Sequence, residues 1–210
     1  MTDIHARLLV TEREALLPLL RRTPAEGFDR PTVCTEWSVR DVIAHCATAL
    51  VRVATGTAHG FRPEENQADV DERKSWPIED VLAELERGYA LGASSDDVAS
   101  VALGEWVHGG DIREALGEPD AYASAGVEDA LTLLVDESAE EGLSPTDVEL
   151  TDAEALSLRA ATLRLGDPGA APVGRLRTDT AGLFRIVANR RPELADHSLE
   201  GVALADLRLF

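Results

Sequence analysis

Positive charge is scarce in this chain, and its scarcity argues against one large class of partner. The 210 residues carry 39 acidic and only 20 basic side chains, which gives a net charge of -19 and an isoelectric point near 4.5. A surface this acidic repels the phosphate backbone of nucleic acids. We therefore expect no nucleic-acid partner.

The chain also lacks the segments that direct a protein into a membrane. No apolar run reaches the roughly 20 residues that a membrane-spanning helix needs. The stretch Met1–His5 has neither the basic nor the apolar region of a secretory signal peptide. Hydrophobic residues still make up 44% of the chain, enough for an ordinary core. We expect a folded cytoplasmic protein without a membrane partner, in one domain or two small ones.

Cysteine is nearly absent, which excludes a disulfide framework. The chain has only Cys34 and Cys46. Cys46 falls on an apolar helical stripe and is interpreted as an ordinary core residue. Cys34 comes just before that helix, where it is either an accessible thiol or a small packing residue.

Apolar residues recur with helical spacing in the first two thirds of the chain and alternate in the last third. The pattern predicts helices over 3–22, 37–57, 77–91, 94–116 and 124–141, and a polar loop over 63–76. After Gly142 it predicts strands over 148–151, 156–165 and 173–178, a helix over 181–189 capped by Thr178 or Thr180, and a short helix over 204–210. This change predicts an α+β fold, with a helical bundle over 1–142 and a small α+β domain over 143–210.

The stretch from Thr35 to His45 carries the first candidate site. Thr35 and Ser38 can each accept a hydrogen bond from a free N–H of the first helical turn. His45 lies on the flank of the apolar stripe of this helix, and Asp41, one turn earlier, is placed to orient its ring. The ring either bonds a neighbour in the core or turns a nitrogen toward a metal.

Residues 103–113, Leu-Gly-Glu-Trp-Val-His-Gly-Gly-Asp-Ile-Arg, carry the second candidate site. Glu105 and His108 fall on one helical line, because steps of three and four residues keep to one face. With His45 from another helix they would form three ligands around an open position, as in a catalytic zinc site. The alternative is a buried hydrogen bond between Glu105 and His108 without a metal.

Three neighbours of His108 add to this pattern. Asp111, one turn later, is either a fourth candidate ligand or a group that orients one. Gly109 and Gly110 are unfavourable inside a helix. They predict a close approach to the helix backbone, for which a ligand is one candidate.

A basic segment interrupts the acidic chain. Residues 159–191 have a net charge of +5, so the remaining residues carry -24. The arginines of this segment either hold an anionic small molecule or pair with acidic residues of the helices.

The two motifs together resemble a known family. Trp-Ser-Val-Arg-Asp-Val-Ile-Ala-His at 37–45 and Trp-Val-His-Gly-Gly-Asp-Ile-Arg at 106–113 are similar to motifs of the mycothiol-dependent maleylpyruvate isomerase family, part of the DinB-like superfamily of thiol-dependent metalloenzymes. Residues 185–192 and 199–205 are similar to the family's C-terminal domain. The resemblance implies an N-terminal DinB-like four-helix bundle followed by a small α/β C-terminal domain.

The resemblance also implies cofactors and ligands. It implies a divalent metal, which is usually zinc in this family, and the low-molecular-weight thiol mycothiol. The metal ligands would be His45, His108 and an acidic residue or histidine one turn before His108. This chain departs from the family there, because Gly104 stands where the carboxylate is usual and Glu105 is one position later. An arginine of the C-terminal domain, best matched by Arg190, would face the same pocket.

We accordingly predict a metal- and mycothiol-dependent isomerase or S-transferase for a small electrophilic substrate that carries a carboxylate. The protein is expected to be a monomer or homodimer. The candidate residues are, for the metal, His45, Glu105 and His108; for catalysis, Arg190 and Asp111; and for cofactor binding, Arg113 and Arg185. One alternative is a metal-free small-molecule-binding module that has kept the bundle and lost the chemistry. Another is a regulatory partner protein that uses its acidic surface.

Overall fold

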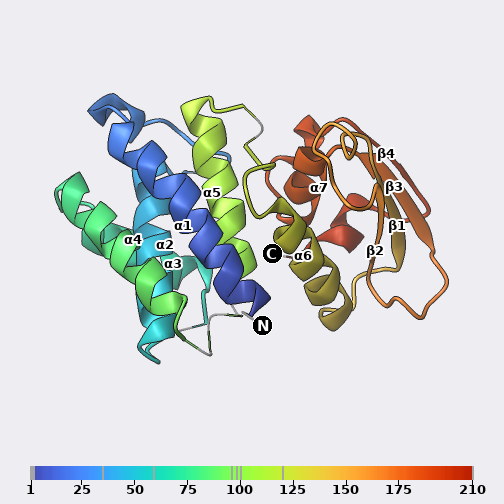
Figure 1. Cartoon of the computed structure of the whole chain (residues 1–210), viewed down its shortest axis with the longest axis horizontal. Coiled ribbons are helices and arrows are strands. Elements are labelled where there is room, and N and C mark those ends of the chain that lie inside the picture. Colours follow the sequence, from blue (N-terminus) through green and yellow to red (C-terminus); the bar gives the residue numbers. More distant parts are fainter. Residues whose placement is uncertain are drawn as a thin grey trace. The chain divides into compact units, whose positions relative to one another are not determined.

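The chain folds into two compact units, Met1–Gly126 and Val127–Phe210. The computed structural model describes residues 3–34, 36–58, 60–95, 97, 99, 101–119 and 121–209. Among the described residues, the regular elements of the first unit are helices, and the first strand begins at Thr146 (Figure 1). The α+β class is therefore confirmed. The boundary between the two units lies at residues 126–127, before helix α6 (Val127–Glu140), whereas the sequence pattern places it at residue 142.

The first unit is built on four helices, α1 (Ile4–Arg22), α2 (Val39–Ala54), α4 (Ile78–Gly92) and α5 (Ala102–Leu116) (Figure 1). Helix α2 packs mainly against α4, and its Val42, Ile43 and Leu50 are fully buried. Each such side chain contributes about 1.5–3 kcal/mol of burial free energy. The apolar stripes seen in the sequence are thus the surfaces on which the bundle packs.

Ser38 caps the start of α2, as the sequence predicts. Its hydroxyl and its backbone N–H both donate to Asp41 Oδ2, at 2.7 and 2.9 Å, and its Oγ accepts from the Asp41 N–H at 3.3 Å. This reciprocal arrangement is a capping box. Asp41 therefore bonds to Ser38 at the helix start. The sequence instead predicts that Asp41 orients the ring of His45. The other predicted cap, Thr35, lies outside the described residues.

The predicted loop over 63–76 is wrong, because the structure has helix α3 (Pro63–Arg73) there. Pro63 fits the first helical turn, and acidic residues follow it where the helix dipole favours them. Two ion pairs then hold the polar helix in place. Asp69 accepts from Arg52 at 2.8 Å, and Arg73 donates to Glu84 at 2.8 Å. Long-range ion pairing, which a local pattern does not reveal, stabilises this helix.

Helix α5 begins later than the sequence predicts. The turn residues at 94–97 suggest a cap there, but the helix starts at Ala102; Asp96 of that predicted cap lies outside the described residues. The predicted end is right. Gly117 follows the helix with a φ of 80°, a left-handed conformation that glycine adopts readily.

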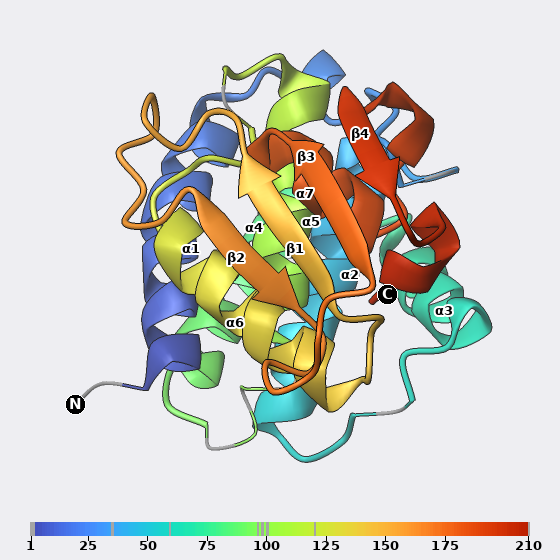
Figure 2. The same ribbon diagram turned by 90° about the vertical axis from the view of Figure 1, so that its right-hand side faces the viewer.

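The second unit is a four-stranded sheet with the strand order β2-β1-β3-β4 (Figure 2). β1 pairs antiparallel with β2 and parallel with β3, which pairs antiparallel with β4. Helices α6 and α7 cover one face of the sheet (Figure 2). The strands and helices are β1 (Thr146–Leu150), β2 (Thr162–Leu165), β3 (Gly174–Thr178), β4 (His197–Glu200), α6 (Val127–Glu140) and α7 (Thr180–Val187).

Alternation predicts the inner face of this sheet well. Val148, Leu165 and Leu176 are buried on it. Residues 156–161 form a turn followed by irregular backbone rather than a strand, and the sequence did not predict strand β4. The N-cap of α7 is Asp179, which accepts a bond from the Gly182 N–H at 2.6 Å, so the predicted threonine caps are wrong.

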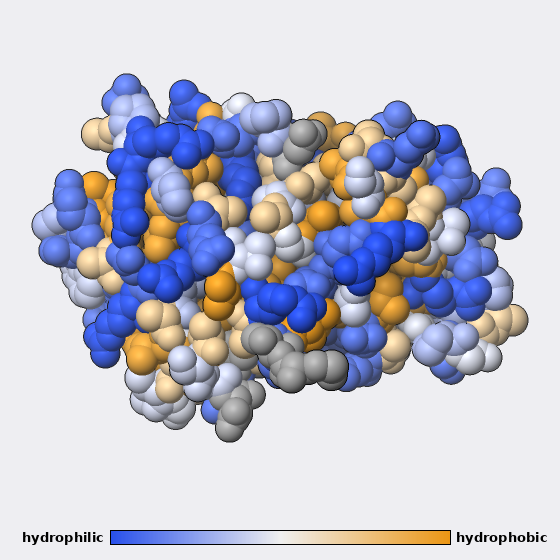
Figure 3. All heavy atoms as spheres, viewed as in Figure 1, coloured by the Kyte–Doolittle hydropathy of each residue, from blue (hydrophilic) through white to orange (hydrophobic). Residues whose placement is uncertain are grey.

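Hydrophilic and hydrophobic residues are interspersed on the face of the molecule that Figure 3 shows. None of the helices among the described residues is long and apolar enough to cross a bilayer.

Gly109 and Gly110 allow two side chains to lie against the α5 backbone. A Cβ at Gly109 would lie 1.8 Å from Glu12 Oε1, and a Cβ at Gly110 would lie 2.3 Å from the ring of Tyr122. The close approach that the sequence predicts is therefore present, and protein side chains make it. At Gly104, in the same helix, a Cβ would meet nothing within 4 Å.

The side chain that passes over Gly109 belongs to a buried ion pair. Arg113 Nη2 donates to both carboxylate oxygens of Glu12, at 2.7 and 2.8 Å. Glu12 is fully buried and Arg113 is 6% exposed. Losing one partner of such a pair leaves an uncompensated charge in the core, which typically costs about 3–5 kcal/mol.

We expect Gly109→Ala and Gly104→Ala to have opposite effects on the free energy of unfolding. The alanine at 109 displaces Glu12 from Arg113 and should lower the stability by about 3 kcal/mol. The alanine at 104 has space and better helix propensity, so it should raise the stability by about 0.5–1 kcal/mol. Urea unfolding of the three proteins measures both changes. Equal effects of the two substitutions would contradict this account of Gly109.

Candidate functional site

Three side chains that can ligate a metal meet at α5. His108 and Asp111 belong to the helix, and Cys34 comes from the segment before α2. The Cys34 thiol donates to Asp111 Oδ2 at 2.9 Å and lies 3.6 Å from His108 Nδ1. His108 Nδ1 lies 3.1 Å from the same carboxylate oxygen. One ligand atom from each residue thus lies within 4.8 Å of the other two.

Tyr122 holds the second oxygen of this carboxylate. Its hydroxyl donates to Asp111 Oδ1 at 2.6 Å, and both residues are almost completely buried. The tyrosine ring reaches this position because it packs on Gly110, where any larger residue would collide with it. Asp111 therefore has one oxygen fixed by Tyr122, while the other faces Cys34 and His108.

His45 lies beside the cluster without being one of its three residues. Its ring centre is 5.1 Å from that of His108, with the two planes at 79°, and 5.0 Å from the nearest ring of Trp37. The two histidines of the sequence motifs are thus neighbours on two different helices. The group of mutually close ligand atoms nevertheless consists of Cys34, His108 and Asp111.

Glu105 lies in the interior of the bundle. It is 3% exposed, its carboxyl is hydrogen-bonded to the Cys46 thiol, and its Oε2 has no partner among the described residues. Burial raises the pKa of this carboxyl well above its ordinary value near 4.5, and the nearby Glu12 raises it further. Burial and the same Glu105 also raise the pKa of Cys46.

The three arginines that the sequence analysis selects have different surroundings. Arg113, expected to bind the cofactor, is buried in its pair with Glu12. Arg185 lies on α7 and Arg190 follows that helix, so both belong to the second unit. A role for Arg185 and Arg190 at the His45–His108 pocket stays a prediction.

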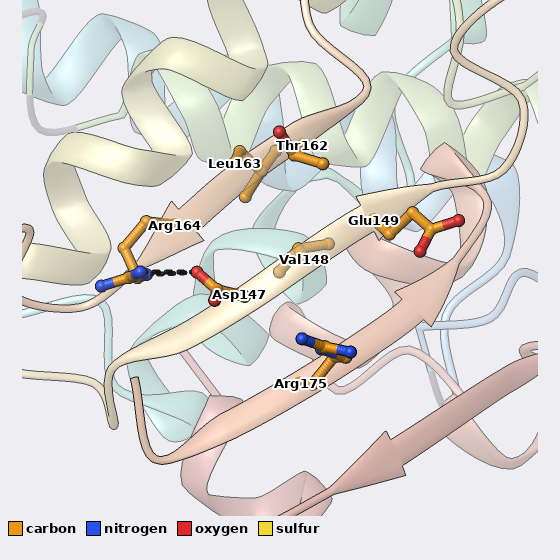
Figure 4. A pocket seen from close by; sticks show the side chains of 7 residues that line it. All are labelled: Asp147, Val148, Glu149, Thr162, Leu163, Arg164 and Arg175. Atoms are coloured by element: carbon orange, nitrogen blue, oxygen red, sulfur yellow. Dashed lines mark hydrogen bonds and ion pairs between the residues drawn. The ribbon is translucent and has the colours of Figure 1, made fainter. Parts of the chain in front are cut away.

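The open face of the sheet carries a hollow of about 600 Å³ that is lined mainly by charged residues. Figure 4 shows Asp147 directed toward Arg164, with which it forms an ion pair at 2.6 Å, and Arg175 on the adjacent strand. Glu149, which also lines the hollow, pairs with Arg177 at 3.2 Å. Acidic and basic groups thus largely compensate each other at this hollow.

The same pairing accounts for much of the basic segment. Arg164 and Arg177 pair with acidic residues of β1, Arg159 lies 3.9 Å from Glu128, and Arg191 lies 3.5 Å from Glu193. Exposed pairs of this kind are worth at most about 1 kcal/mol each. For these arginines the structure favours pairing with nearby acids over a dedicated anion site.

Cys34 and Tyr122 are the residues around Asp111 that the sequence did not assign to a site. The sequence leaves Cys34 as either an accessible thiol or a packing residue, and in the structure it is buried. Cys34 is 77 positions from Asp111 along the chain, and Tyr122 follows α5 in an irregular segment. Neither belongs to a periodic pattern that points to the site. The sequence feature that could have indicated Tyr122 is the pair Gly109 and Gly110, which predicts a close approach to the α5 backbone next to His108.

We expect Glu105→Gln to raise the free energy of unfolding above that of the parent protein at pH 7–8. The raised pKa means that Glu105 binds a proton on folding at pH values above about 4.5. Its contribution to stability therefore falls as pH rises through that range, and glutamine, which resembles the neutral acid, removes this loss. Urea unfolding from pH 4 to 8 should show the two proteins converging at the acidic end.

Glu14→Gln, at an exposed position of α1, is the control and should not change the pH dependence. A Glu105→Gln variant that is less stable at pH 7–8 would indicate that Glu105 is ionised in the fold.

Comparison with known proteins agrees with these observations. A family model described as "Mycothiol maleylpyruvate isomerase N-terminal domain" matches residues 9–130, while no curated protein matches the chain. A crystal structure of the mycothiol-dependent maleylpyruvate isomerase is similar over 95% of this chain and 93% of that one, with a TM-score of 0.58 and 13% identity. A histidine-to-alanine mutant of a mycothiol-dependent maleylpyruvate isomerase has the same coverage and identity, with a TM-score of 0.56.

At 13% identity, the similarity to these solved structures shows only a shared fold. The family model is stronger evidence, because it spans more than half of the chain and includes Cys34, His45, His108 and Asp111. The chain therefore belongs to the mycothiol maleylpyruvate isomerase family, as a member that carries its N-terminal domain.

Proposed function

We propose that this protein is a mycothiol-dependent enzyme, an isomerase or S-transferase, that uses a divalent metal. The proposal depends above all on one observation, the cluster of ligand atoms around His108 inside the family's N-terminal domain. The similar solved structures are of maleylpyruvate isomerases, so maleylpyruvate is the first substrate to test. Its carboxylates and activated double bond are typical of the small electrophilic substrates that the sequence analysis expects.

The residues at the site fit a metal ion by their chemistry. Cys34, His108 and Asp111 offer sulfur, nitrogen and oxygen atoms, and zinc accepts all three ligand types. His108 belongs both to this cluster and to the set His45, Glu105 and His108 that the sequence predicts. We therefore propose that His108 holds the metal, with zinc as the first candidate.

The metal and the thiol together would supply a nucleophile. A thiol bound to zinc loses its proton near neutral pH, and reversible addition of the thiolate to a double bond permits cis–trans rotation. The chain's own residues would position the reactants. We propose that Asp111, whose Oδ2 lies 3.1 Å from His108 Nδ1, acts as part of the metal site, and that Arg190 binds a substrate carboxylate. Arg185 remains a candidate for binding polar groups of mycothiol.

Arg113 has a different role in this proposal. Its guanidinium already pairs with both oxygens of the buried Glu12, so binding a cofactor would break an interior ion pair. We propose that Arg113 fixes α5 to α1 and so supports the segment that carries His108 and Asp111.

A second candidate function is a metal-free binding module. Two observations favour it. Gly104 has no side chain at the position where the family usually has a carboxylate, and Glu105 is hydrogen-bonded to Cys46 in the bundle interior. In that case the contacts among Cys34, His108 and Asp111 would be hydrogen bonds of the folded bundle. Metal content separates the two candidates.

We expect protein purified without a histidine tag to contain about one zinc ion per chain and to isomerise maleylpyruvate only with mycothiol. His108→Ala should lose the metal and lower the isomerisation rate at least about 100-fold, because the remaining ligands hold zinc poorly. Elemental analysis and a spectrophotometric assay measure the two effects. His197→Ala, in the sheet of the second unit, is the matched control and should retain both.

Metal-free protein after zinc supplementation would favour the binding module. Metal-dependent transfer of mycothiol to an electrophile, without isomerisation, would identify an S-transferase.

A further inference from the structure

We propose that the metal ligands of this protein are Cys34, His108 and Asp111, a thiolate, an imidazole and a carboxylate. This set replaces His45, Glu105 and His108, which sequence reasoning predicts. The inference rests on the proposed function only in that a metal binds at His108. It adds the identity of the ligands and the class of metal that they select.

The distances in the cluster suit one ion. Two ligand atoms on a tetrahedral zinc, with bonds of about 2.0–2.3 Å, lie about 3.3–3.6 Å apart. Cys34 Sγ and His108 Nδ1 are 3.6 Å apart, and His108 Nδ1 and Asp111 Oδ2 are 3.1 Å apart. The Cys34 Sγ to Asp111 Oδ2 distance of 2.9 Å is that of a hydrogen bond and needs to lengthen by about half an ångström.

The cluster is also held in position by its surroundings. Cys34 is 5% exposed and Asp111 is fully buried, whereas the His108 side chain remains 12% exposed. The Tyr122 hydroxyl donates a hydrogen bond to Asp111 Oδ1, which leaves Oδ2 as the oxygen that faces Cys34 and His108. Groups that orient a ligand in this way commonly set metal affinity. We therefore infer that Tyr122 is a positioning residue of the site.

The alternative ligand set is less suited to bind an ion. Glu105 is hydrogen-bonded to Cys46 in the bundle interior and is only 3% exposed. Gly104, one turn before His108, offers no side chain at all. His45 lies beside the cluster, with its ring 5.1 Å from that of His108, and it is absent from the group of mutually close ligand atoms. In this proposal His45 packs beside the site, and Cys34 and Asp111 complete it.

A thiolate ligand changes which metals the site selects. Sulfur ligands favour zinc and cobalt over magnesium, calcium and manganese, which prefer oxygen. Three protein ligands also leave a fourth position open, as in catalytic zinc sites. That position is where the proposed function needs an external thiol to bind.

Cobalt(II) provides a direct test, because a cobalt–thiolate bond absorbs in the near ultraviolet as a charge-transfer band. We expect the apoprotein titrated with cobalt to develop this band at one equivalent. Cys34→Ser should lose the band and bind cobalt at least about 100-fold more weakly, while its hydroxyl can still bond Asp111. Cys46→Ser is the matched control and should keep both the band and the affinity. His45→Ala should also keep the band.

Several outcomes would overturn this ligand set. One is cobalt binding without the band, together with loss of binding in His45→Ala and normal binding in Cys34→Ser. That result leaves the proposed function standing on the sequence-predicted ligands. Absence of cobalt and zinc binding refutes both ideas. Binding with the band but without mycothiol-dependent activity refutes only the proposed function.

We expect Tyr122→Phe to weaken cobalt binding about 10- to 100-fold while leaving the charge-transfer band in the saturated protein. Phenylalanine keeps the ring on Gly110 and removes only the hydroxyl that holds Asp111 Oδ1. Equilibrium titration against a chelator measures the affinity, and circular dichroism checks the fold. Unchanged affinity would show that Tyr122 has no positioning role.

Discussion

The buried carboxylate of Asp111 is the group on which the candidate site depends. A carboxylate without solvent needs donors on both oxygens, because an unpaired buried charge is very unfavourable. Tyr122 donates to one oxygen, while Cys34 and His108 meet at the other. These partners come from the segment before α2, from α5 and from the segment after it. Satisfying one carboxylate therefore brings three parts of the first unit together.

Helix α5 combines this site with an important structural contact. One turn of the helix carries His108 and the two glycines, and the next carries Asp111 and Arg113. The Glu12–Arg113 pair crosses Gly109, and the Tyr122 ring covers Gly110. The glycines reduce helix propensity, but they let both contacts reach the backbone. The position of the site is thus tied to the packing of α5 against its neighbours.

Family membership and the residues around His108 both support the proposed function, but they point to different metal ligands. The family model covers the bundle, and the ligand cluster lies within it. The carboxylate expected one turn before His108 is missing, since Gly104 has no side chain and Glu105 is bonded to Cys46. A thiol and a different carboxylate lie beside the same histidine. The proposed change of ligands around His108 would account for these observations together.

Sequence alone determined the elements whose stability is local or periodic. The apolar stripes of the bundle, the Ser38 cap, the Gly117 helix end and the alternating strands follow from side-chain spacing and backbone preferences. The pairing of the motifs around His45 and His108 also pointed to the family. Only the tertiary structure decided that 63–73 is a helix, that Glu105 bonds Cys46, and that Cys34 and Tyr122 reach Asp111. Each of these depends on burial or on contacts between residues far apart in the chain, which no local pattern records.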